Sequence, residues 1–589
     1  MSNLILTNEL IYKSFMIGAK NVISEKNGLN AINVFPVPDG DTGSNLASMM
    51  STIIEKARLG KTSEETMQSI ADAAIVGARG NSGIIFAQYI YGFSMGVKEE
   101  EITPERFVQI VENASNQAYK AISKPVEGTM ITLMRQFAKT LSTLKNASRN
   151  FIDLLSKAYE SLKEDLAKTP ELLPVLKENK VVDAGAKGFV HFVEGFIKAF
   201  KGEDVIVTHE HEHIEEMHVD HLEDSEYRYC TEALVRGENL NVEQIKKDLV
   251  VFGNSLVVAG TNRTVRIHIH TNEPEHVFSY FDGYAKIIEQ KVDDMKRQFE
   301  TANHRKYPIA LVTDSIADLP FDLVEKYQIH MVPLNLMIDD QNYFDKLTIH
   351  NDRFYQIMDK QGVYPTSSQP NVKSLENLYS FLTTYYDEVI VITVSQKMSG
   401  TYQAFVEASK AFPNKKIHVI NSKQNSGAEG LIVMKAAEMI DQGKSFDEVI
   451  HGVEALIPHS RILVSVKTLK YMIRSGRLKK AKKVVAQALN LKPIISIDEA
   501  GEGIIFDKGF NIKTADKKIL NFMKKTHEES GIVDYAIVHA KADDRVVQYE
   551  KALTEMLGKK PTYIMEISTI VAMNAGIGSL AVAYIKGEK

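Results

Sequence analysis

The sequence predicts a multidomain protein with an all-helical domain first, then a small α+β domain, then a two-lobed α/β domain. Three observations predict this order. Apolar residues recur at helical spacing from residue 7 to about residue 202, strands and helices then alternate in a short segment, and a longer strand–helix alternation fills the second half. At 589 residues the chain is too long for one hydrophobic core. The expected boundaries are 1–202 for the helical domain, 203–225 for a linker, 226–304 for the middle domain, and about 305–460 and 461–589 for the two lobes.

Composition and charge exclude several classes of function. The net charge of -6 argues against a nucleic acid that is bound through neutralised phosphates. Cys230 is the only cysteine, so no disulfide can form within the chain. The first residues lack a basic segment followed by a long apolar one, and no apolar run reaches about 18 residues. We therefore expect a cytoplasmic protein that binds no nucleic acid.

Residues 33–45 (Asn-Val-Phe-Pro-Val-Pro-Asp-Gly-Asp-Thr-Gly-Ser-Asn) predict a metal-phosphate site just before a helix. Pro36 and Pro38 force the chain to approach in an extended conformation, and the two glycines let backbone amides come close to a ligand. Asp39 and Asp41 supply the carboxylate oxygens that Mg²⁺ takes together with phosphate oxygens. An Asx-turn that caps the helix is the alternative for so short a motif.

Three further glycine-containing breaks separate helical patterns, at residues 77–83, 125–130 and 183–188. The first lies directly before a helix, so its free amides and the helix dipole would favour an anion. Each break alone is more typical of a turn between helices. Four such loops in one helical domain, two of them polar enough to hold phosphate, favour a phosphate-binding site.

The middle segment predicts a β-α-β-β-α-β module with two histidines on one strand. His268 and His270 are two residues apart, so they project from the same face of an extended strand. If the strand of Cys230 lies alongside, one thiolate and two imidazoles fill three positions of a tetrahedral Zn²⁺ site, with Glu232 or water as the fourth ligand. A core cysteine with two ordinary strand histidines is the alternative. For the acidic, histidine-rich linker, a solvated segment is favoured over metal capture because nothing apolar there would order it.

The second half predicts a mostly parallel sheet with its ligands at the carboxyl ends of the strands. Polar loops at 312–315, 366–370 and 395–403 fall at those ends. Their hydroxyls and amides come without a histidine base or a nucleophile-elbow motif, so they suit carboxylate binding better than serine hydrolysis. For Ser315 and Thr401 a helix N-cap is the alternative. The expected strands include 309–313, 330–337, 388–393 and 416–421.

Residues 33–45, 78–83 and 182–185 resemble the nucleotide-binding helical barrel of dihydroxyacetone kinases, and most closely the ATP-binding component of bacterial fatty acid kinases. The resemblance implies ATP and Mg²⁺ as cofactors, with Asp39 and Asp41 as the catalytic pair that holds the ion. It also implies residues near the nucleotide: Asn33, Thr42, Gly43, Ser44, Asn45, Gly80, Asn81, Ser82, Gly83, Thr129 and Asp183. The same family has a Tyr-Cys-Thr-Glu and a His-x-His-Thr-Asn pattern in its middle domain, which favours zinc at Cys230, His268 and His270.

Residues 307–589, with their polar loops and the segment 471–477 (Tyr-Met-Ile-Arg-Ser-Gly-Arg), resemble the DegV family of fatty-acid-binding proteins. The resemblance implies an apolar tunnel between two lobes and a polar group of residues around the acyl carboxylate: Ser367, Ser368, Ser399, Gly400, Thr401 and Arg477. The family usually has a histidine near the C-terminus in a Gly-Thr-His-Thr-Gly-Pro-Gly context. Asn574 takes its place here, and an amide can donate a hydrogen bond but cannot become charged.

Together the two resemblances imply a fused fatty acid kinase that moves the γ-phosphoryl group of ATP onto a long-chain fatty acid and gives an acyl phosphate for phospholipid synthesis. A carboxylate acceptor is ionised at pH 7, so this reaction needs positioning and charge neutralisation but no general base. The implied partners are a downstream acyltransferase and a second copy in a homodimer, and a peripheral membrane contact is compatible with the same analogy. A fatty-acid-binding carrier or regulator without turnover is the first alternative. A dihydroxyacetone-type kinase is disfavoured because no sugar-binding domain with its covalent histidine is recognisable.

Overall fold

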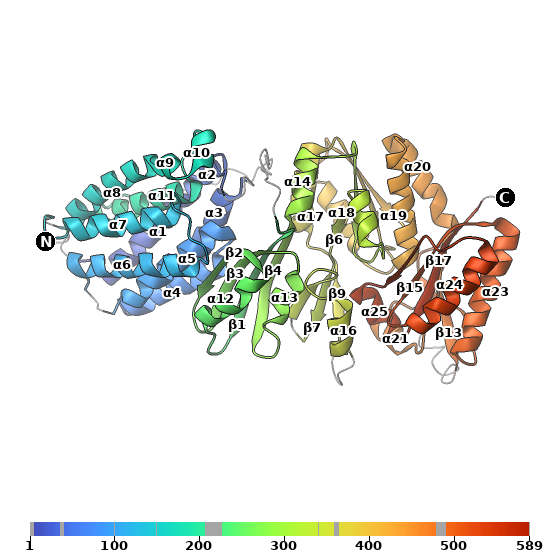
Figure 1. The fold of residues 1–589 in the computed structure, drawn as a ribbon. Helices are drawn as coiled ribbons and strands as arrows, with labels where there is room; N and C mark the ends of the chain where they lie inside the picture. The colour runs from blue at the N-terminus through green and yellow to red at the C-terminus, as the bar shows by residue number, and fades with distance from the viewer. Residues whose placement is uncertain are drawn as a thin grey trace. The chain divides into compact units, whose positions relative to one another are not determined.

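A computed structural model of the chain divides into two compact units, residues 1–303 and 304–589, which are considered separately (Figure 1). Asp39, residues 36–38 and most of the expected linker lie outside the part of the chain that is described. The structure describes residues 5–35, 40–98, 101–148, 150–205, 226–339, 341–358, 364–478 and 491–587.

The first unit begins with a closed ring of antiparallel helices, as the helical spacing predicts. Going round the ring, the neighbours in contact are α1, α3, α4, α5, α6, α7, α8 and α11, and α11 closes on α1. The helices are α1 (Asn8–Ser24), α2 (Lys26–Asn30), α3 (Thr42–Lys56), α4 (Ser63–Gly77), α5 (Gly80–Gly96), α6 (Pro104–Ala121), α7 (Met130–Leu144), α8 (Phe151–Ala167), α9 (Thr169–Leu172), α10 (Pro174–Glu178) and α11 (Ala184–Phe200).

Aromatic side chains fill the inside of this ring. Phe15 of α1 packs edge-on against Phe192 and Phe196 of α11, and Phe86 of α5 packs edge-on against Phe189 and Phe192. Such edge-to-face pairs add about 0.5 to 1.5 kcal/mol each to the free energy gained by burial. The centre of the ring is therefore a packed core, and only the ends of the helices remain for binding a ligand.

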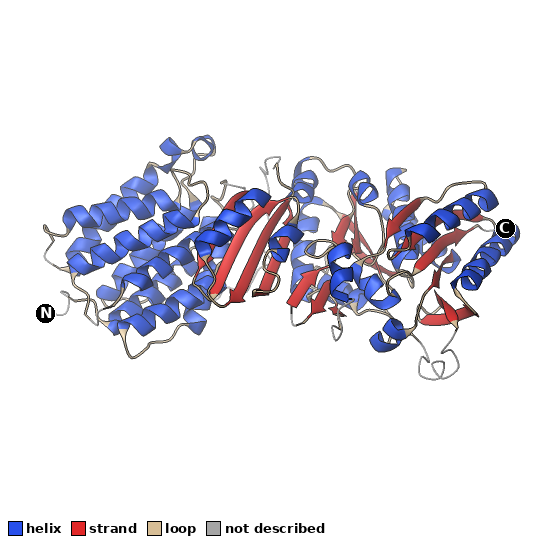
Figure 2. Cartoon of the chain, turned by 60° about the horizontal axis from the view of Figure 1, so that its bottom comes forward, coloured by secondary structure: helices blue, strands red, loops and turns tan. Residues whose placement is uncertain are grey.

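The rest of the first unit is a four-stranded antiparallel sheet in the order β2-β3-β1-β4, with helices on one face (Figure 2). The predicted β-α-β-β-α-β order is confirmed. Leu234, Val257 and Ala259 of the sheet join the hydrophobic core of the helical ring, so sheet and ring form one unit. The elements are β1 (Tyr229–Gly237), α12 (Val242–Leu249), η1 (Val250–Phe252), β2 (Gly253–Gly260), β3 (Thr264–Thr271), α13 (Pro274–Ser279), β4 (Ala285–Asp294) and α14 (Met295–Asn303).

The first lobe of the second unit contains a parallel sheet, β11-β10-β5-β6, as the alternation predicts, and a small antiparallel sheet, β8-β7-β9. Its elements are β5 (Ile309–Asp314), α15 (Phe321–Lys326), β6 (His330–Val332), β7 (Asn335–Ile338), β8 (Gln341–Phe344), α16 (Asn351–Met358), β9 (Thr366–Ser368), α17 (Val372–Tyr385), β10 (Glu388–Thr393), α18 (Thr401–Ser409), β11 (Lys416–Asn421), α19 (Ser426–Asp441), α20 (Phe446–Leu456) and η2 (Ile457–His459).

Two local predictions in this lobe are wrong. The strand predicted at 330–337 is two strands, β6 and β7, in different sheets, because Pro333 between them has no amide with which to continue a ladder. The loop predicted at 366–370 begins as strand β9, which pairs with β7 in an antiparallel ladder. Its three short polar residues gave no strand pattern, so only the pairing with β7 reveals it.

The second lobe is a six-stranded sheet in the order β14-β13-β12-β17-β15-β16. It is antiparallel except for the β15–β16 pair, so the expectation of a mostly parallel sheet does not extend to this lobe. The elements are β12 (Ser460–Ser465), α21 (Lys470–Ser475), β13 (Lys492–Ile497), β14 (Gly503–Gly509), α23 (Ile512–Ser530), β15 (Ile532–His539), α24 (Asp543–Leu557), β16 (Tyr563–Glu566), α25 (Thr569–Ala575) and β17 (Leu580–Lys586).

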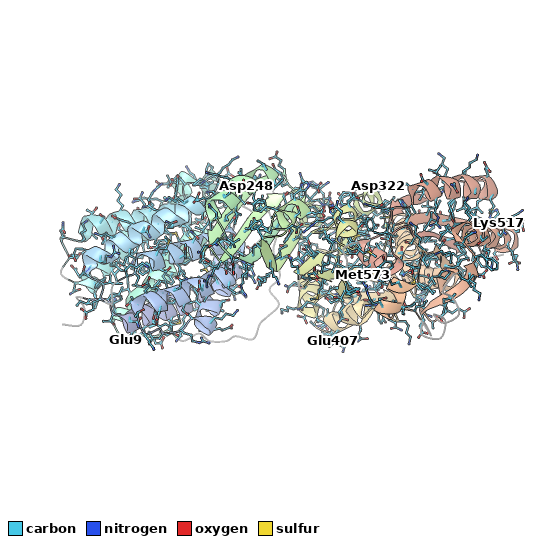
Figure 3. All side chains as sticks on the ribbon, turned by 90° about the horizontal axis from the view of Figure 1, so that it is seen from below. Glu9, Asp248, Asp322, Glu407, Lys517 and Met573 are labelled. Atoms are coloured by element: carbon cyan, nitrogen blue, oxygen red, sulfur yellow. The ribbon has the colours of Figure 1, made fainter. Side chains whose placement is uncertain are left out.

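The charged side chains of both units lie on their surfaces. Glu9 of α1 and Lys517 of α23 are exposed, whereas Met573 of α25 is buried (Figure 3). Within the described residues, no helix is both long and apolar enough to cross a membrane.

Candidate functional site

The four loops singled out in the helical region all become helix N-termini. Asp41 is the N-cap of α3, Arg79 that of α5, Thr129 that of α7 and Asp183 that of α11. The first turn of a helix presents amide groups that have no partner within the helix, and the dipole adds a partial positive charge there. Each of these four positions can therefore attract an anion.

The start of α3 is held by side chains from the preceding loop. The Thr42 hydroxyl donates a short hydrogen bond to the side-chain oxygen of Asn33. The Asn30 side chain accepts from the Ser44 amide at 3.0 Å and donates to the Ser44 hydroxyl at 2.9 Å. Gly43 is needed here because a Cβ would overlap the backbone of Lys26. Asn33, Thr42 and Ser44 thus fix the loop that presents Asp41.

Contacts between glycines and side chains bring three of the other helix starts together. Gly80 has a φ of +58°, and a Cβ on it would collide with the side-chain amide of Asn45 on α3. A Cβ on Gly185 of α11 would lie 3.1 Å from Ser82 Oγ on α5 and 3.1 Å from Met130 on α7. The N-termini of α3, α5, α7 and α11 therefore meet at one end of the ring, and the nucleotide residues predicted from the sequence, apart from Asp39, belong to this group.

Asp183 closes the group at α11. Its carboxylate accepts from the Ala186 amide at 2.7 Å and from the Met130 amide, while its own amide donates to Thr169 Oγ1. Thr129, one residue before Met130, donates its hydroxyl to the Val126 carbonyl. Burial raises the pKa of Asp183 to about 7, even though the two amides act against the rise.

This raised pKa gives a prediction for stability. The folded chain holds a proton on Asp183 up to about pH 7, whereas the unfolded chain releases it near the ordinary value of 3.8, so the free energy of unfolding contributed by this group falls as the pH rises from about 4 to 7. Denaturant unfolding of the wild type and of Asp183→Asn across that range should show a steeper decline for the wild type. Equal slopes would contradict the assignment.

The group fits a nucleotide bound with a divalent ion. Asn81 Oδ1, in the first turn of α5, is buried and has no hydrogen-bond partner among the described residues, so an acceptor is left for a cation or a donor. The first turn of α5 contains Gly80 and Gly83, which leave its amides accessible to phosphate oxygens. Asp41 adds a carboxylate, the kind of ligand Mg²⁺ takes alongside phosphate.

The sheet of the first unit carries the predicted thiolate–imidazole set. The ligand atoms of Cys230, His268 and His270 all lie within 4.8 Å of one another. In a tetrahedral zinc site the bond lengths place ligand atoms roughly 3.3 to 3.8 Å apart, so small side-chain rotations would close the set around an ion. Nε2 of His268 is buried without a partner among the described residues, as a ligand atom would be.

Protonation of this cluster also suits metal binding. Burial, with the neighbouring His268, lowers the pKa of His270 to about 3, so its imidazole is neutral. Burial and the charges of Glu232 and Asp293 raise the pKa of the Cys230 thiol. A thiol in these surroundings becomes a thiolate when a metal ion displaces its proton. One thiolate and two neutral imidazoles are ligands that zinc accepts.

Glu232 joins this cluster to the helix starts. Its Oε1 accepts from the Gly80 amide at 2.8 Å and lies 3.4 Å from His268 Nδ1. Burial alone would raise its pKa, but the His268 hydrogen bond and charge outweigh burial, and the pKa of Glu232 falls to about 2. Glu232 is therefore an ionised bridge between the predicted zinc cluster and the first amide of α5.

The second unit contains a cavity of about 420 Å³ between its two lobes. Ser367, Ser368, Ser399, Gly400, Arg477 and Asn574, all predicted from the sequence, line it. Thr401 does not line the cavity. It is fully buried behind Ser399, and the two hydroxyls lie 2.8 Å apart.

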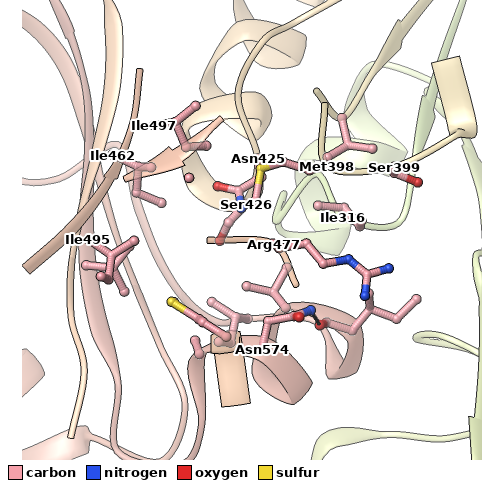
Figure 4. Close-up of a pocket in the computed structure, with 18 of the residues that line it drawn as sticks. Ile316, Met398, Ser399, Asn425, Ser426, Ile462, Arg477, Ile495, Ile497 and Asn574 are labelled. Atoms are coloured by element: carbon pink, nitrogen blue, oxygen red, sulfur yellow. Dashed lines mark hydrogen bonds between the residues drawn. The ribbon is translucent and has the colours of Figure 1, made fainter. Parts of the chain in front are cut away.

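The cavity is polar on one side and apolar on the other. Among the described residues that line it, Arg477 alone carries a charge. Figure 4 places Arg477 and Ser399 on one side of the cavity and Ile462, Ile495 and Ile497 on the opposite side. An elongated ligand with one anionic end fits this distribution of polarity.

Asn574 stands at the polar side on α25. Its Nδ2 donates to the Ile570 carbonyl at 2.8 Å, which leaves one N–H for a ligand, and its Oδ1 is buried with no partner among the described residues. Sequence reasoning missed Asn425, which lines the cavity between the polar and apolar sides. Its position directly after β11, at the carboxyl end of a parallel strand, was the available signal.

Comparison with known proteins divides the chain into three matched regions. Residues 36–198 match the DAK2 domain, residues 226–302 match the middle domain of the FakA-like fatty acid kinase proteins, and residues 308–587 match the DegV family of uncharacterised proteins.

Two curated relatives are similar over about half of the chain. An uncharacterized protein of Staphylococcus epidermidis is 35% identical over 312 residues, which are 50% of this chain and 56% of that protein. Protein YloV of Bacillus subtilis is 34% identical over 316 residues, which are 51% of this chain and 57% of that protein. The chain thus spans little more than half the length of these relatives.

Two solved structures are similar to the second half. The crystal structure of DegV, a fatty acid binding protein from Bacillus subtilis, is 27% identical with a TM-score of 0.45, and covers 48% of this chain and 100% of that one. A fatty-acid-binding DegV family protein from Thermus thermophilus is 26% identical with a TM-score of 0.45, and covers 47% of this chain and 99% of that one. One polypeptide therefore joins a DAK2 region, a FakA-like middle domain of the fatty acid kinase type, and a DegV-family region.

Proposed function

We propose that this chain is an ATP-dependent fatty acid kinase that phosphorylates the carboxylate of a fatty acid held in its DegV-family half. The observation that carries the proposal is the pairing, in one chain, of a phosphate-binding group of helix N-termini with a cavity suited to a long apolar anion. The match of the sheet domain to a fatty acid kinase component supports the same substrate class.

The helical half would bind ATP by its phosphates. Amides at the starts of α3 and α5 would donate to phosphate oxygens, and Asn45 and Ser82 would border them. Asp39 and Asp41 would hold Mg²⁺, which supplies positive charge that offsets the charge of the phosphates. Asp183 would stay largely protonated at neutral pH and so add little repulsion to the polyphosphate.

The DegV-family half would present the acid. The Arg477 guanidinium, the Ser399 hydroxyl and one Asn574 N–H would hold the carboxylate, and the isoleucines on the opposite side would bury the alkyl chain. Burial of each CH₂ group stabilises the complex by about 0.8 kcal/mol, so chain length would contribute strongly to affinity.

The chemistry needs no general base, because the acid is ionised at neutral pH. A carboxylate oxygen of the fatty acid forms a bond to the γ-phosphorus, and the bond between that phosphorus and the β–γ bridging oxygen breaks. ADP leaves with the bridging oxygen, and the product is an acyl phosphate. Acyl phosphates are activated acyl donors, so an acyltransferase would consume this product.

The direct test measures ADP release from ATP and Mg²⁺ with and without a long-chain fatty acid, and traps the product with hydroxylamine as a hydroxamate. Fatty-acid-dependent ADP release with a matching amount of hydroxamate supports the proposal. If fatty acid binds but ADP release does not depend on it, the chain is a carrier or a regulator. Dihydroxyacetone as the acceptor tests the third alternative in the same assay.

We also propose a structural zinc ion on Cys230, His268 and His270. Elemental analysis of the purified chain should find about one zinc per molecule, and His270→Ala should remove most of it because two remaining ligands do not hold the ion tightly. His276→Ala is the matched control, since this histidine lies on α13 outside the cluster. A metal-free wild type that keeps its fold would contradict the site.

A further inference from the structure

The sheet of the first unit turns a row of charged side chains toward the helix starts. In the antiparallel pair of β1 and β4, Glu232 is opposite Lys291 and Cys230 is opposite Asp293. Residues directly opposite each other in such a pair project to the same face. Lys291 and Asp293 therefore share the face of the sheet that carries the predicted zinc cluster.

This face meets the place where the phosphates are expected. Glu232 accepts the amide of Gly80, the first residue of α5, at 2.8 Å. The negative charge of Asp293, with further contributions from Glu232 and Asp41, raises the pKa of Lys291. Lys291 is thus a permanent cation near both Asp41 and the start of α5.

The two arginines of the same region are bound elsewhere. Arg79 Nη2 lies 2.8 Å from Glu289, and Arg266 Nη2 lies 3.3 Å from the same carboxylate and 3.1 Å from the Val76 carbonyl. Arg266 is only 2% exposed. Both guanidiniums therefore join sheet to ring and are not placed to bind a nucleotide.

Lys291 is placed differently. Its side chain is 49% exposed, and its Nζ is held by Asp293 Oδ2 at 2.6 Å. An ammonium group has three N–H donors, so this ion pair orients the group and leaves two donors for a ligand. Nothing in this arrangement is needed for packing of the sheet.

We infer that Lys291 is a catalytic residue that contacts the terminal phosphate of the nucleotide, so the sheet completes a site that the helical ring begins. The inference rests on the proposed function, because it assumes that ATP phosphates lie at the starts of α3 and α5. A lysine here would neutralise charge on the γ-phosphoryl group as it moves to the acid, which is the main demand of phosphoryl transfer. Asp293 would be its positioning residue.

The test compares nucleotides that differ by one phosphate. In the full-length chain, Lys291→Met should weaken binding of a non-hydrolysable ATP analogue with Mg²⁺ about tenfold, measured by calorimetry, and leave ADP binding within about twofold, because a charge-assisted hydrogen bond to one phosphate is lost. Lys286→Met on the same strand is the control and should change neither. Lys291→Gln serves as a second variant, and thermal unfolding checks the fold of each.

The outcomes separate the two proposals. If both Lys291 variants bind the ATP analogue as the wild type does, or lose ADP and analogue binding equally, this inference is overturned. If the wild type binds no nucleotide at all, the proposed kinase function fails instead. If Lys291→Arg recovers part of the discrimination, a direct contact of the cation with phosphate is supported over a general electrostatic effect on the sheet.

Discussion

Replacing Asp41 with asparagine is expected to lower fatty-acid-dependent ADP release about 1000-fold. Asparagine keeps the size of the side chain and the start of α3, but it removes the negative charge that would hold Mg²⁺. Charge stabilisation by a bound metal is worth several kcal/mol in a transition state, and three orders of magnitude correspond to about 4 kcal/mol. The measurement is the initial rate at saturating ATP, fatty acid and Mg²⁺.

Two controls make this result specific. Asp153→Asn removes a carboxylate from the first turn of α8, which lies in the same ring but outside the group of loops, and should leave the rate within about twofold. Fatty acid binding to Asp41→Asn should equal that of the wild type, because the cavity belongs to the other unit. A variant that turns over at more than a tenth of the wild-type rate would exclude Asp41 from the metal site.

The positions of the helix starts could be predicted from local chemistry, and their convergence could not. Prolines and glycines on either side of Asp41 dictate where α3 begins, and Thr103 with Pro104 dictates the start of α6. That Gly80 fits against Asn45, and Gly185 against Ser82, depends on how the ring closes. No periodicity along one helix carries that information.

The zinc cluster was predictable because strand alternation is a local rule. His268 and His270 must share a face, and one cysteine on a neighbouring strand completes the set. The bridge from Glu232 to Gly80 and the place of Lys291 opposite Glu232 depend on the β1–β4 register and on the packing of the sheet against α5. Both are tertiary facts, so Lys291 looked like an ordinary surface lysine in the sequence.

In the DegV-family half, polar loops after strands marked the carboxylate side of the cavity, but the order of the strands misled where the pattern was short. Thr366–Ser368 is a strand because β7 pairs with it, and the second lobe is antiparallel although helices also separate its strands. The apolar wall of Ile462, Ile495 and Ile497 belongs to strands whose pattern resembles any buried strand. Only the facing of two lobes makes these side chains the lining of a cavity.

Replacing Arg477 with methionine is expected to weaken fatty acid binding about 10- to 100-fold. Methionine keeps the apolar stem that borders the cavity, but it removes the one charge among the described lining residues, and a hydrogen bond to a charged group contributes about 1.5 to 3 kcal/mol. Binding is measured by calorimetry or by displacement of a fluorescent fatty acid. Arg474→Met is the matched control, because Arg474 is exposed, lies over the Tyr364 ring and does not line the cavity.

A fatty alcohol of the same chain length separates the head group from the tail. The alcohol has no charge for Arg477 to bind, so its affinity should change by no more than about twofold in Arg477→Met, while the affinity for the acid falls. Equal losses for acid and alcohol would mean that the substitution has damaged the apolar wall, and equal affinity of the wild type for both would mean that the cavity does not select a carboxylate. A loss confined to the acid assigns the carboxylate to the side of the cavity shared by Arg477 and Ser399, opposite the isoleucine wall.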